Sequence, residues 1–507
     1  MPRMLALLLL WSRNFSHKGD NMQASCDGVR LRILSDKQVE ELHLATLQIL
    51  ERTGVTFECE EALTILGNAG ADVSNPKAVK IPSYMVEQAL RTAPKIITLY
   101  TREGEPAIVL DRMTGAHFGA KADLPDFLDP NTRKRRGSYI ADIADMARLI
   151  DALPNIEWSY TSGSNRTLPG SIADKVGLLQ VVLNSSKPVI YETTDAESLR
   201  EAISLCSIVA GGEEQLRKKP FFGSSCEPVS PLVQGKTAME KSLLCAEKGL
   251  PIVVYSMPMA GATVPATFAG CLAVANAEIL SQLVVLQLKS PGAPVIYGSI
   301  PSIMDMKTTI FSYGAPEMSL MVGALTDLCH YYKLPMFGTA GAADAGVLGI
   351  QATAEITYQL LVSALSGADL VHNAGMLYHA TVLSPELLVL VNEVVDMVNV
   401  LLGGVEVNNE TLALDIIDRL GPGSNYLSES HTLKHFRKFW VPKTFDRSMA
   451  RGKDTKDCEQ LLNQRTIEIL ETHKSKALPE DLIKELKKVE KTWFDGAGLK
   501  YEYPRRD

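Results

Sequence analysis

The chain alternates eight times between two kinds of segment, and this repetition limits its possible folds more than any other feature of its 507 residues. Short apolar runs, typical of buried strands, are each followed by a longer stretch with apolar residues at helical spacing. The runs are AHFGA (116–120), IEWSYTS (156–162), PVIYETT (188–194), PFFGSS (220–225), PIVVYSM (251–257), PVIYGS (294–299), PMFGT (335–339) and DLVHNA (369–374). The helical stretches are 138–153, 172–185, 196–210, 237–249, 266–289, 317–333, 350–367 and 385–402.

Strands that are apolar along their whole length indicate burial on both faces, as parallel sheets require. Strands that alternate with helices indicate βαβ units. Eight such units with no spare strand predict an α/β fold, a (β/α)8 TIM barrel over residues 116–404. The alternative is an open doubly wound sheet. No G-x-G-x-x-G follows a strand, which disfavours dinucleotide binding.

Three further segments flank the predicted barrel. Residues 31–115 form an N-terminal extension of helices and strands, in which Ser35 and Gln38 resemble a capping box. Residues 405–507 are predicted to be a C-terminal helical segment that packs on the barrel. Residues 1–30 are interpreted as a disordered or misassigned extension, with Met22 as the alternative start. Their short apolar run resembles a signal peptide without a clear cleavage site, so export is the competing interpretation.

Composition excludes several classes of function. A net charge of −8 gives no electrostatic reason to bind nucleic acid. The eight cysteines are scattered without a CxxC pair, which favours a reduced cytoplasm over a disulfide framework or zinc site. The chain contains no run of 18 apolar residues, so no membrane span is predicted. The basic run at 133–136 is interpreted as a solvated loop, or alternatively as a docking patch.

In a barrel of this kind the active site forms where the strands end. Residues that end or follow the predicted strands, most of them polar, are Lys121, Asp123, Ser162, Ser164, Glu192, Thr193, Ser225, Cys226, Glu227, Ser256, Met257, Ser299, Thr339, His372 and Asn373. They contain no catalytic triad, no HExxH and no set of metal ligands at a known spacing. The residues alone therefore indicate a barrel enzyme whose chemistry stays open.

Six long segments carry a more specific signal. They are RRGSYIADIADMARLIDALPNIEW (135–158), PMAGATVPATFAG (258–270), NAEILSQLVVLQLKSPGAPVIYGSIPSIMDM (276–306), GAPEMSL (314–320), IQATAEITYQLLVSALSGADLVHNAGML (350–377) and GPGSNYLSESHTLKHFRKFWVPKTFDR (421–447). Together they resemble the trimethylamine methyltransferase family of corrinoid-dependent methyltransferases. The resemblance covers residues from about 31 to 447.

The resemblance implies a cytoplasmic barrel that binds a methylated amine and presents one methyl to Co(I) of a separate corrinoid protein. The corrinoid would be carried by that partner and none held tightly by this chain; a homo-oligomer is also expected. One branch of the family carries pyrrolysine, whereas this chain has only standard residues. The other branch acts on small quaternary amines such as glycine betaine. A quaternary nitrogen already carries its charge and leaves as a neutral tertiary amine, so the protein has only to orient it.

One motif departs from the family pattern. Members often have T-D-S-K-x-x-D-x-Q-A-G-x-E after the seventh strand, where this chain reads AADAGVLGIQATAE (342–355). Asp344, Gln351 and Glu355 are kept, while the Ser-Lys pair and the second Asp are lost. The pocket floor is therefore expected to differ. This change motivates two alternatives: a barrel lyase or hydrolase that uses no corrinoid, and a non-catalytic osmolyte-binding protein.

Aromatic rings are the expected partners of a quaternary ammonium, which has no N–H to donate. The predicted substrate-binding residues are Tyr100, Tyr297, Tyr313 and Phe337, with Lys307 as the partner of a betaine carboxylate. The alternative for each ring is ordinary core packing.

The predicted catalytic residues are Gln351, Glu355 and His372. Gln351 and Glu355 lie one helical turn apart on one face. Glu355 has the alternative role of stabilising a helix N-terminus, and His372 that of a core histidine. His431 and His435 lie beyond the barrel without an evident third metal ligand, and a structural or docking role is favoured there.

Overall fold

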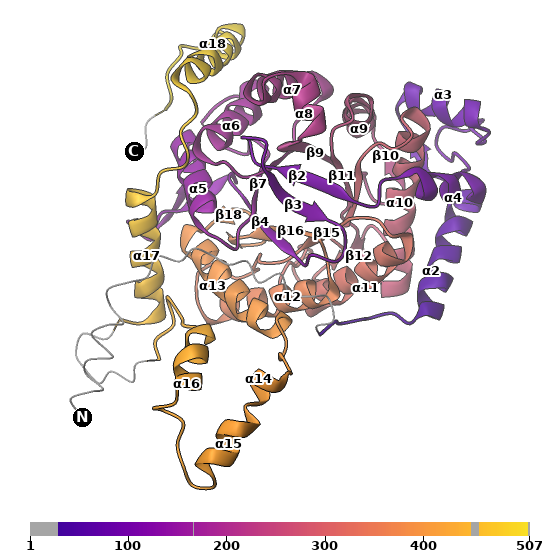
Figure 1. Cartoon of the computed structure of the whole chain (residues 1–507). Coiled ribbons are helices and arrows are strands. Elements are labelled where there is room, and N and C mark those ends of the chain that lie inside the picture. The colour runs from indigo at the N-terminus through magenta and orange to yellow at the C-terminus, as the bar shows by residue number, and fades with distance from the viewer. Residues whose placement is uncertain (1–28, 166, 448–455, 505–507) are drawn as a thin grey trace.

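The computed structural model describes residues 29–165, 167–447 and 456–504. Residues 1–28, and with them most of the interpreted extension 1–30, lie outside this part of the chain. Eight parallel strands close into a barrel in chain order, with the last pairing with the first (Figure 1). They are β4 (His117–Lys121), β7 (Trp158–Thr161), β8 (Val189–Tyr191), β9 (Phe222–Cys226), β11 (Ile252–Ser256), β13 (Val295–Ser299), β15 (Met336–Thr339) and β16 (Leu370–Ala374). The predicted (β/α)8 barrel is confirmed.

A helix follows every strand and returns outside the barrel. These helices are α5 (Ile140–Ala152), α6 (Gly170–Asn184), α7 (Ala196–Ala210), α9 (Lys236–Lys248), α10 (Phe268–Lys289), α11 (Pro316–Tyr332), α12 (Ile350–Ser366) and α13 (Pro385–Leu402). A short α8 (Glu213–Lys218) follows α7. Because all neighbouring strands of the barrel pair in parallel, their C-terminal ends lie at the same end of the barrel. We call that C-terminal end the mouth.

Side chains alternate along each strand between the inside and the outside of the barrel, and this alternation decides which of them lie inside. A separate apolar cluster contains alternate strand residues, among them Trp158 and Tyr160 of β7 and Tyr255 of β11. This cluster is the lumen. A Cβ at Gly298 would lie 2.9 Å from both Tyr255 and Phe337, so the absence of a side chain there leaves room for two rings.

A hairpin closes the barrel at the end opposite the mouth. β2 (Ile97–Tyr100) pairs antiparallel with β3 (Pro106–Leu110) and lies across the strand N-termini, in front in Figure 1. Leu99 and Ile108 join the lumen cluster, and the Tyr100 N–H donates to the carbonyl of Pro220, just before β9. We call this hairpin the plug.

The N-terminal extension packs on the outside of the barrel. It contains α2 (Asp36–Gln48), the π-helix η1 (Ile49–Thr53), α3 (Glu60–Ala69) and α4 (Ser83–Thr92), with β1 (Thr56–Phe57) pairing with β10 (Val233–Gln234). Ser35 and Gln38 form the predicted capping box. All three α-helices contact α10. Among the described residues, α10 alone is long and apolar enough to cross a membrane, and 83% of its most apolar window is buried in the fold.

Loops at the mouth carry small sheets. β17 (Met376–Leu377), β18 (Val382–Leu383), β5 (Asp126–Leu128) and β6 (Arg135–Gly137) form one, and β12 (Met259–Ala260) pairs with β14 (Ser302–Ile303). The basic run at 133–136 was interpreted as a solvated loop, and the structure corrects this for its second half. Arg135 and Arg136 belong to β6, and Arg136 pairs with Asp129 and with the buried Asp142.

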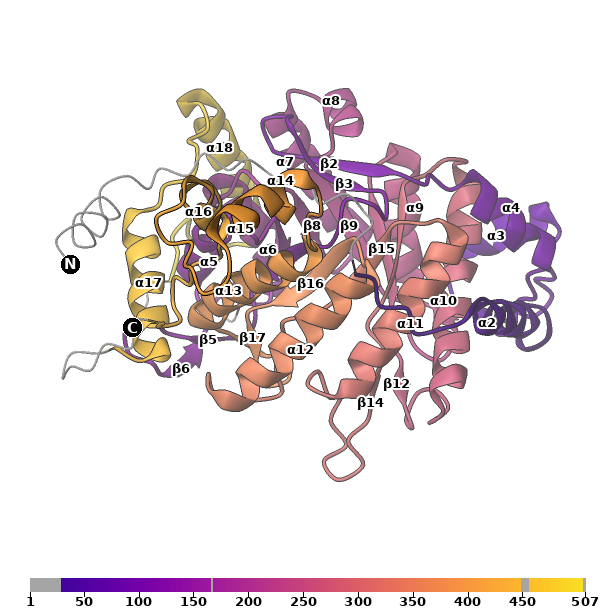
Figure 2. The same cartoon turned by 60° about the horizontal axis from the view of Figure 1, so that its bottom comes forward.

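Only the second part of the C-terminal segment packs on the barrel. α17 (Cys458–Thr472) packs against α13 and α5, and α18 (Glu480–Gly496) against α6 and α7 (Figure 2). Before them, α14 (Asn409–Leu412), α15 (Leu414–Leu420), α16 (Ser430–His435) and the 3-10 helix η2 (Phe436–Lys438) project away from the body. The expectation that all of 405–507 packs on the barrel therefore does not hold for this first part.

Candidate active site at the barrel mouth

Three charged residues stand where barrel strands end. Lys121 is the last residue of β4, Glu192 follows β8, and Glu227 follows β9. All three are partly exposed, whereas the lumen residues beneath them are buried. The strand-end rule placed these residues among the candidates, and the closed barrel brings the ends of their strands to the same end, the mouth.

A histidine forms the aromatic centre below them. The ring of His372 lies 4.4 Å from that of Tyr160 and 5.4 Å from that of Phe337, centroid to centroid, and stacks with Trp158 at 6.0 Å. Burial, and secondarily the charge of Lys121, lowers the pKa of His372 well below its ordinary value, so the imidazole is neutral. Neither ring nitrogen has a hydrogen-bond partner among the described residues.

The two glutamates are held by hydroxyl groups and repel each other. The Tyr160 hydroxyl donates to Glu192 Oε2 at 2.8 Å and shares a hydrogen bond of 2.8 Å with the Ser225 hydroxyl. Burial, followed by the charge of Glu192, raises the pKa of Glu227 to about 7, although a hydrogen bond with Tyr255 acts in the opposite direction. Glu227 therefore changes its protonation near neutral pH, and a cation placed between the carboxylates would favour its ionised form.

Lys121 is the ammonium group of this opening. Its Nζ lies 5.2 Å from the centroid of the Tyr160 ring. No carboxylate of the described residues lies within 4.0 Å of it, although its charge acts on both Glu227 and Asp123. The mouth thus combines an anionic side, an aromatic floor and the ammonium group of Lys121.

Behind the opening, two buried carboxyl groups fix the loops. Asp123 accepts hydrogen bonds from the backbone N–H groups of Ser162 and Ser164, which hold the loop after β7. Glu278 of α10 accepts from the Ser230 hydroxyl and the Leu232 N–H of the loop after β9, and also contacts the Ser256 hydroxyl. Burial raises the pKa of both carboxyl groups.

The structure places Phe337 and His372 together in the lumen below the mouth, and Tyr313 packs against the lumen cluster from a loop. Tyr313 lies in the loop before α11, and its pKa is raised by burial, then by the nearby charges of Glu227, Asp344 and Glu192. These charges indicate that its phenol faces the acidic side. Tyr313 also packs on Phe311 at 5.0 Å between ring centroids.

Gln351 and Glu355 support this loop from behind. Glu355 accepts hydrogen bonds from the Asp344 N–H at 2.9 Å and from the Gln351 side-chain amide at 2.7 Å. A Cβ at Gly314 would lie 2.5 Å from the Glu355 carboxyl carbon, so the carboxylate fits against that glycine. Asp344 in turn accepts the Tyr313 N–H at 2.7 Å. We therefore interpret these predicted catalytic residues as positioning residues for Tyr313.

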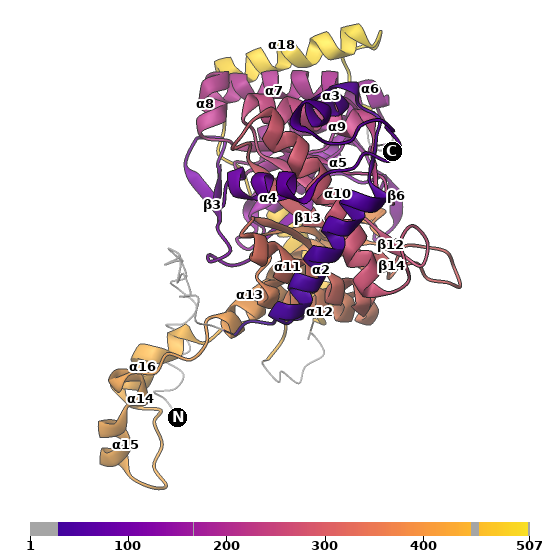
Figure 3. The same ribbon diagram turned by 90° about the vertical axis from the view of Figure 1, so that its right-hand side faces the viewer.

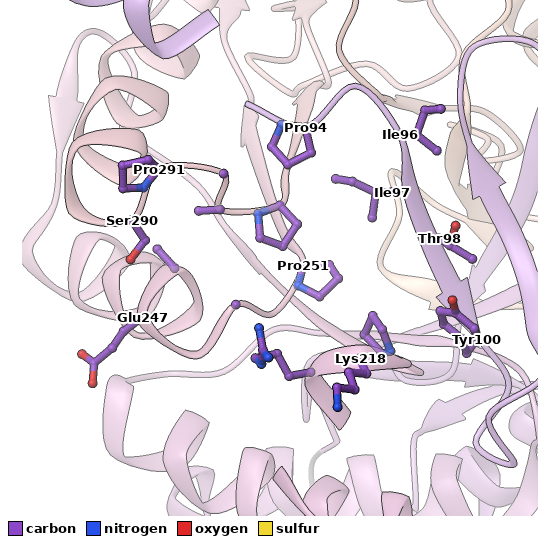
Figure 4. Close-up of a pocket in the computed structure, with 17 residues that line it drawn as sticks. Pro94, Ile96, Ile97, Thr98, Tyr100, Lys218, Glu247, Pro251, Ser290 and Pro291 are labelled. Carbon is purple, nitrogen blue, oxygen red and sulfur yellow. The ribbon is translucent and has the colours of Figure 1, made fainter. Parts of the chain in front are cut away.

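Two predicted aromatic residues lie elsewhere. Tyr100 is at the opposite end of the barrel, beside a surface pocket of about 550 Å³ between the plug and the strand N-termini (Figure 4). The side chain of Tyr297 in β13 points away from the lumen, toward the surrounding helices. It packs against Tyr332 of α11, and its hydroxyl donates to Asn276 of α10 at 2.9 Å.

Lys307 also lies apart from the charged cluster. It is exposed in the loop that follows β14, next to Met306, which is 75% exposed. Its backbone N–H donates to the Asp305 carboxylate at 2.8 Å, which shapes a turn at the loop tip. Lys307 was predicted to pair with a betaine carboxylate, whereas the lysine that lies beside the Tyr160 ring is Lys121.

Sequence reasoning did not select four residues of the mouth as site residues. Glu192, Glu227 and Lys121 appeared only among the strand ends, and Tyr160 not at all. The strand-end position was the available signal for the charged residues. For Tyr160, the alternation of lumen and outward positions along β7 would have been needed.

Comparison with known proteins identifies the family of the chain. The family model for trimethylamine methyltransferase (MTTB) matches residues 16–492. The chain belongs to the trimethylamine methyltransferase family. It is 34% identical over 482 residues to the trimethylamine methyltransferase MttB of Desulfitobacterium hafniense, covering 94% of this chain and 97% of that protein.

Other relatives of the family carry different substrate names. A trimethylamine methyltransferase MttB of Methanosarcina thermophila is 31% identical, covering 91% of this chain and 97% of that protein. A glycine betaine methyltransferase of Desulfitobacterium hafniense is 30% identical, covering 89% and 95%. This chain is thus a methyltransferase, within a family whose named members act on more than one amine.

Proposed function

We propose that the protein transfers a methyl group from a small quaternary amine to Co(I) of a cognate corrinoid protein. The observation that carries this proposal is the composition of the mouth: two glutamates and several aromatic rings around one opening, suited to a quaternary ammonium. In the reaction the methyl carbon is displaced from nitrogen onto cobalt. The C–N electron pair stays on nitrogen, which leaves as a neutral tertiary amine, so no proton has to be supplied.

The residues of this chain would divide the work of binding. Tyr160, Tyr255 and Tyr313 would present aromatic faces or hydroxyl dipoles to the ammonium, while Glu192 and Glu227 would balance its charge. The buried, neutral His372 would limit the depth of the site without adding a positive charge that repels the substrate. A well-placed ring contributes about 0.5–2 kcal/mol to holding such a cation.

Lys121 supports a zwitterionic, betaine-type substrate. Its ammonium lies beside the same Tyr160 ring, and none of the ion pairs of the described residues includes it. A substrate carboxylate paired with Lys121 would turn its cationic end toward the glutamates. Lys307 would not be needed for this pairing.

A second candidate substrate is favoured by Glu227. A tertiary amine is a poor methyl donor unless its nitrogen is protonated, because an amide anion would otherwise have to leave. A carboxyl group with a pKa of about 7 could keep such a proton at the amine nitrogen near neutral pH. The two candidates differ in pH dependence: only a tertiary amine can lose its proton, so only its turnover should fall once the pH exceeds the pKa of the bound ammonium.

The test is a substrate panel with the purified full chain and Co(I) cobalamin or a Co(I) corrinoid protein. Formation of methyl-Co(III) from a quaternary amine, followed by cobalamin absorbance, is the expected result. If no amine of the panel methylates Co(I), the proposal fails. Turnover of an amine without any corrinoid would favour the lyase or hydrolase alternative, and tight binding without any reaction would favour the binding protein.

A further inference from the structure

The loop between β17 and β18 contains three consecutive residues with a left-handed backbone. Tyr378, His379 and Ala380 have φ angles of 51°, 54° and 58°. We call these three residues the left-handed turn. A side chain makes this backbone conformation unfavourable, so it persists only where contacts with the rest of the fold outweigh its cost. Glycine would adopt the same backbone without strain, yet the turn contains none.

Contacts with two neighbouring loops hold the left-handed turn at the mouth. In the loop after β15, the carbonyl of Ala345 accepts the N–H of Tyr378 at 2.9 Å, and the carbonyl of Ala343 accepts that of His379 at 3.3 Å. The guanidinium carbon of Arg135 in β6 lies 4.5 Å from the centre of the Tyr378 ring. Figure 3 shows β6, β12 and β14 on the right, on the opposite side from β3 of the plug.

The side chain of His379 adds a further connection, which reaches Asp344. The Nδ1 atom of His379 lies 2.9 Å from Oδ1 of Asp344. A carboxylate can only accept a hydrogen bond, so Nδ1 carries a proton and donates it. The side chain of His379 is 30% exposed and that of Asp344 15%, so the protein shields most of this contact from competing water.

Asp344 is the point at which three loops of the mouth meet. The same Oδ1 atom accepts the backbone N–H of Tyr313 at 2.7 Å, and Oδ2 contacts the hydroxyl of Ser312. The N–H of Asp344 donates to Glu355 at 2.9 Å. Tyr313 precedes α11, Asp344 follows β15 and His379 follows β17. Because His379 and Tyr313 donate to one oxygen atom, a loss of the first bond changes the position of the acceptor in the second.

We propose that His379 is a positioning residue that fixes Tyr313 at the cation site through Asp344. The left-handed turn supports this role, because a strained backbone without glycine is retained where the side chains that it presents are needed. The proposal gives His379 neither a contact with the substrate nor a proton to transfer. It rests on the proposed function, in which Tyr313 is part of the ammonium-binding site.

Removal of the imidazole should weaken cation binding and leave the chemical step unchanged. In His379→Ala, Asp344 loses its connection to the turn, and the Kd of tetramethylammonium in calorimetric titration should rise about tenfold. The KM for the amine should rise by a similar factor, whereas kcat should change less than about twofold. His379→Asn is the matched control, since asparagine tolerates a left-handed backbone and its amide can donate in place of Nδ1. Its Kd should stay within about twofold of the wild-type value.

Hydrogen exchange without any ligand measures the position of Tyr313 directly. The amide of Tyr313 should exchange about tenfold faster in His379→Ala than in the wild type, and at the wild-type rate in His379→Asn. Amides of the barrel strands should exchange at the wild-type rate in both variants, which shows that they are folded. In the background of Tyr313→Ala, the addition of His379→Ala should leave the Kd of tetramethylammonium unchanged, because both residues act through one contact.

Three results would overturn the role of His379. They are unchanged exchange of the Tyr313 amide in His379→Ala, additive losses of affinity in the double variant, and a His379→Asn variant that binds as weakly as His379→Ala. The proposed function fails on other evidence, namely a wild type that transfers no methyl group to Co(I) from any amine. Since the exchange measurement needs no substrate, it decides on His379 in either case.

Discussion

Exchanging Glu227 for glutamine should remove the pH dependence of cation binding at the mouth. In the free protein, burial and the charge of Glu192 raise the pKa of Glu227 from 4.5 to about 7, against the opposing effects of Tyr255 and Lys121. The charge of Glu278 has a smaller effect in the same direction as that of Glu192. A rise of this size corresponds to about 3 kcal/mol of free energy between the protonated and ionised forms.

The direction in which cation affinity changes with pH follows from this raised pKa. Glu227 is about nine-tenths protonated at pH 6 and about nine-tenths ionised at pH 8. A quaternary ammonium keeps its charge at every pH, so any change in its affinity has to come from the protein. Because the ionised carboxylate attracts the cation, the Kd should fall about tenfold from pH 6 to pH 8 in the wild type. In Glu227→Gln the Kd should be constant over that range.

The same raised pKa affects stability in the opposite direction. In the unfolded chain Glu227 ionises near its ordinary pKa of 4.5, whereas the folded protein retains the proton up to about 7. Its contribution to the free energy of unfolding therefore decreases as the pH rises between these values. Glu227→Gln should be the more stable protein at pH 8, by at most about 3 kcal/mol.

Calorimetric titration with tetramethylammonium or glycine betaine, without any corrinoid, measures these quantities directly. Titrations in buffers of different ionisation enthalpy give the number of protons released, which should be about 0.9 per cation at pH 6 and about 0.1 at pH 8 in the wild type. A wild-type Kd that does not change with pH would refute the reasoning. Proton release that persists in Glu227→Gln would assign the titration to Glu192 or another group instead.

Three further substitutions test other parts of the site. Lys121→Ala should raise the KM for carboxylated quaternary amines about tenfold in steady-state kinetics, which corresponds to a loss of about 1.4 kcal/mol of binding free energy. The KM for choline, which has no carboxylate, should not change. Equal effects on both substrates would contradict the pairing. Gly298→Ala should destabilise the barrel by about 1–3 kcal/mol in denaturant unfolding, since its Cβ would lie 2.9 Å from Tyr255 and Phe337; an unchanged midpoint would show that the lumen has room. Glu355→Ala should raise KM more than it lowers kcat, because it loosens the loop rather than the chemistry; the opposite split would restore Glu355 as a catalytic residue.

The backbone architecture was accessible from the sequence because it depends on local pattern. Eight apolar runs separated by helical stretches leave few parallel arrangements, and the rule that barrel sites form at strand ends selected Lys121, Glu192, Glu227 and His372 as candidates. The six family segments gave the same fold and the class of reaction. Both kinds of signal lie in contiguous stretches of chain, so neither needs knowledge of contacts between distant residues.

Which candidates meet was decided by the tertiary structure. Tyr297 and Phe337 lie in similar apolar strands, yet one faces the helices and the other the lumen. A strand buried on both faces has no polar alternation to reveal its phase, so a shift of one residue would exchange the two sets unnoticed in the sequence. The raised pKa of Glu227 likewise depends on Glu192 of another strand loop and on burial, which arise only when the barrel closes. The chain order determined the barrel and its rim, and the closure of the sheet determined which side chains share the space inside it.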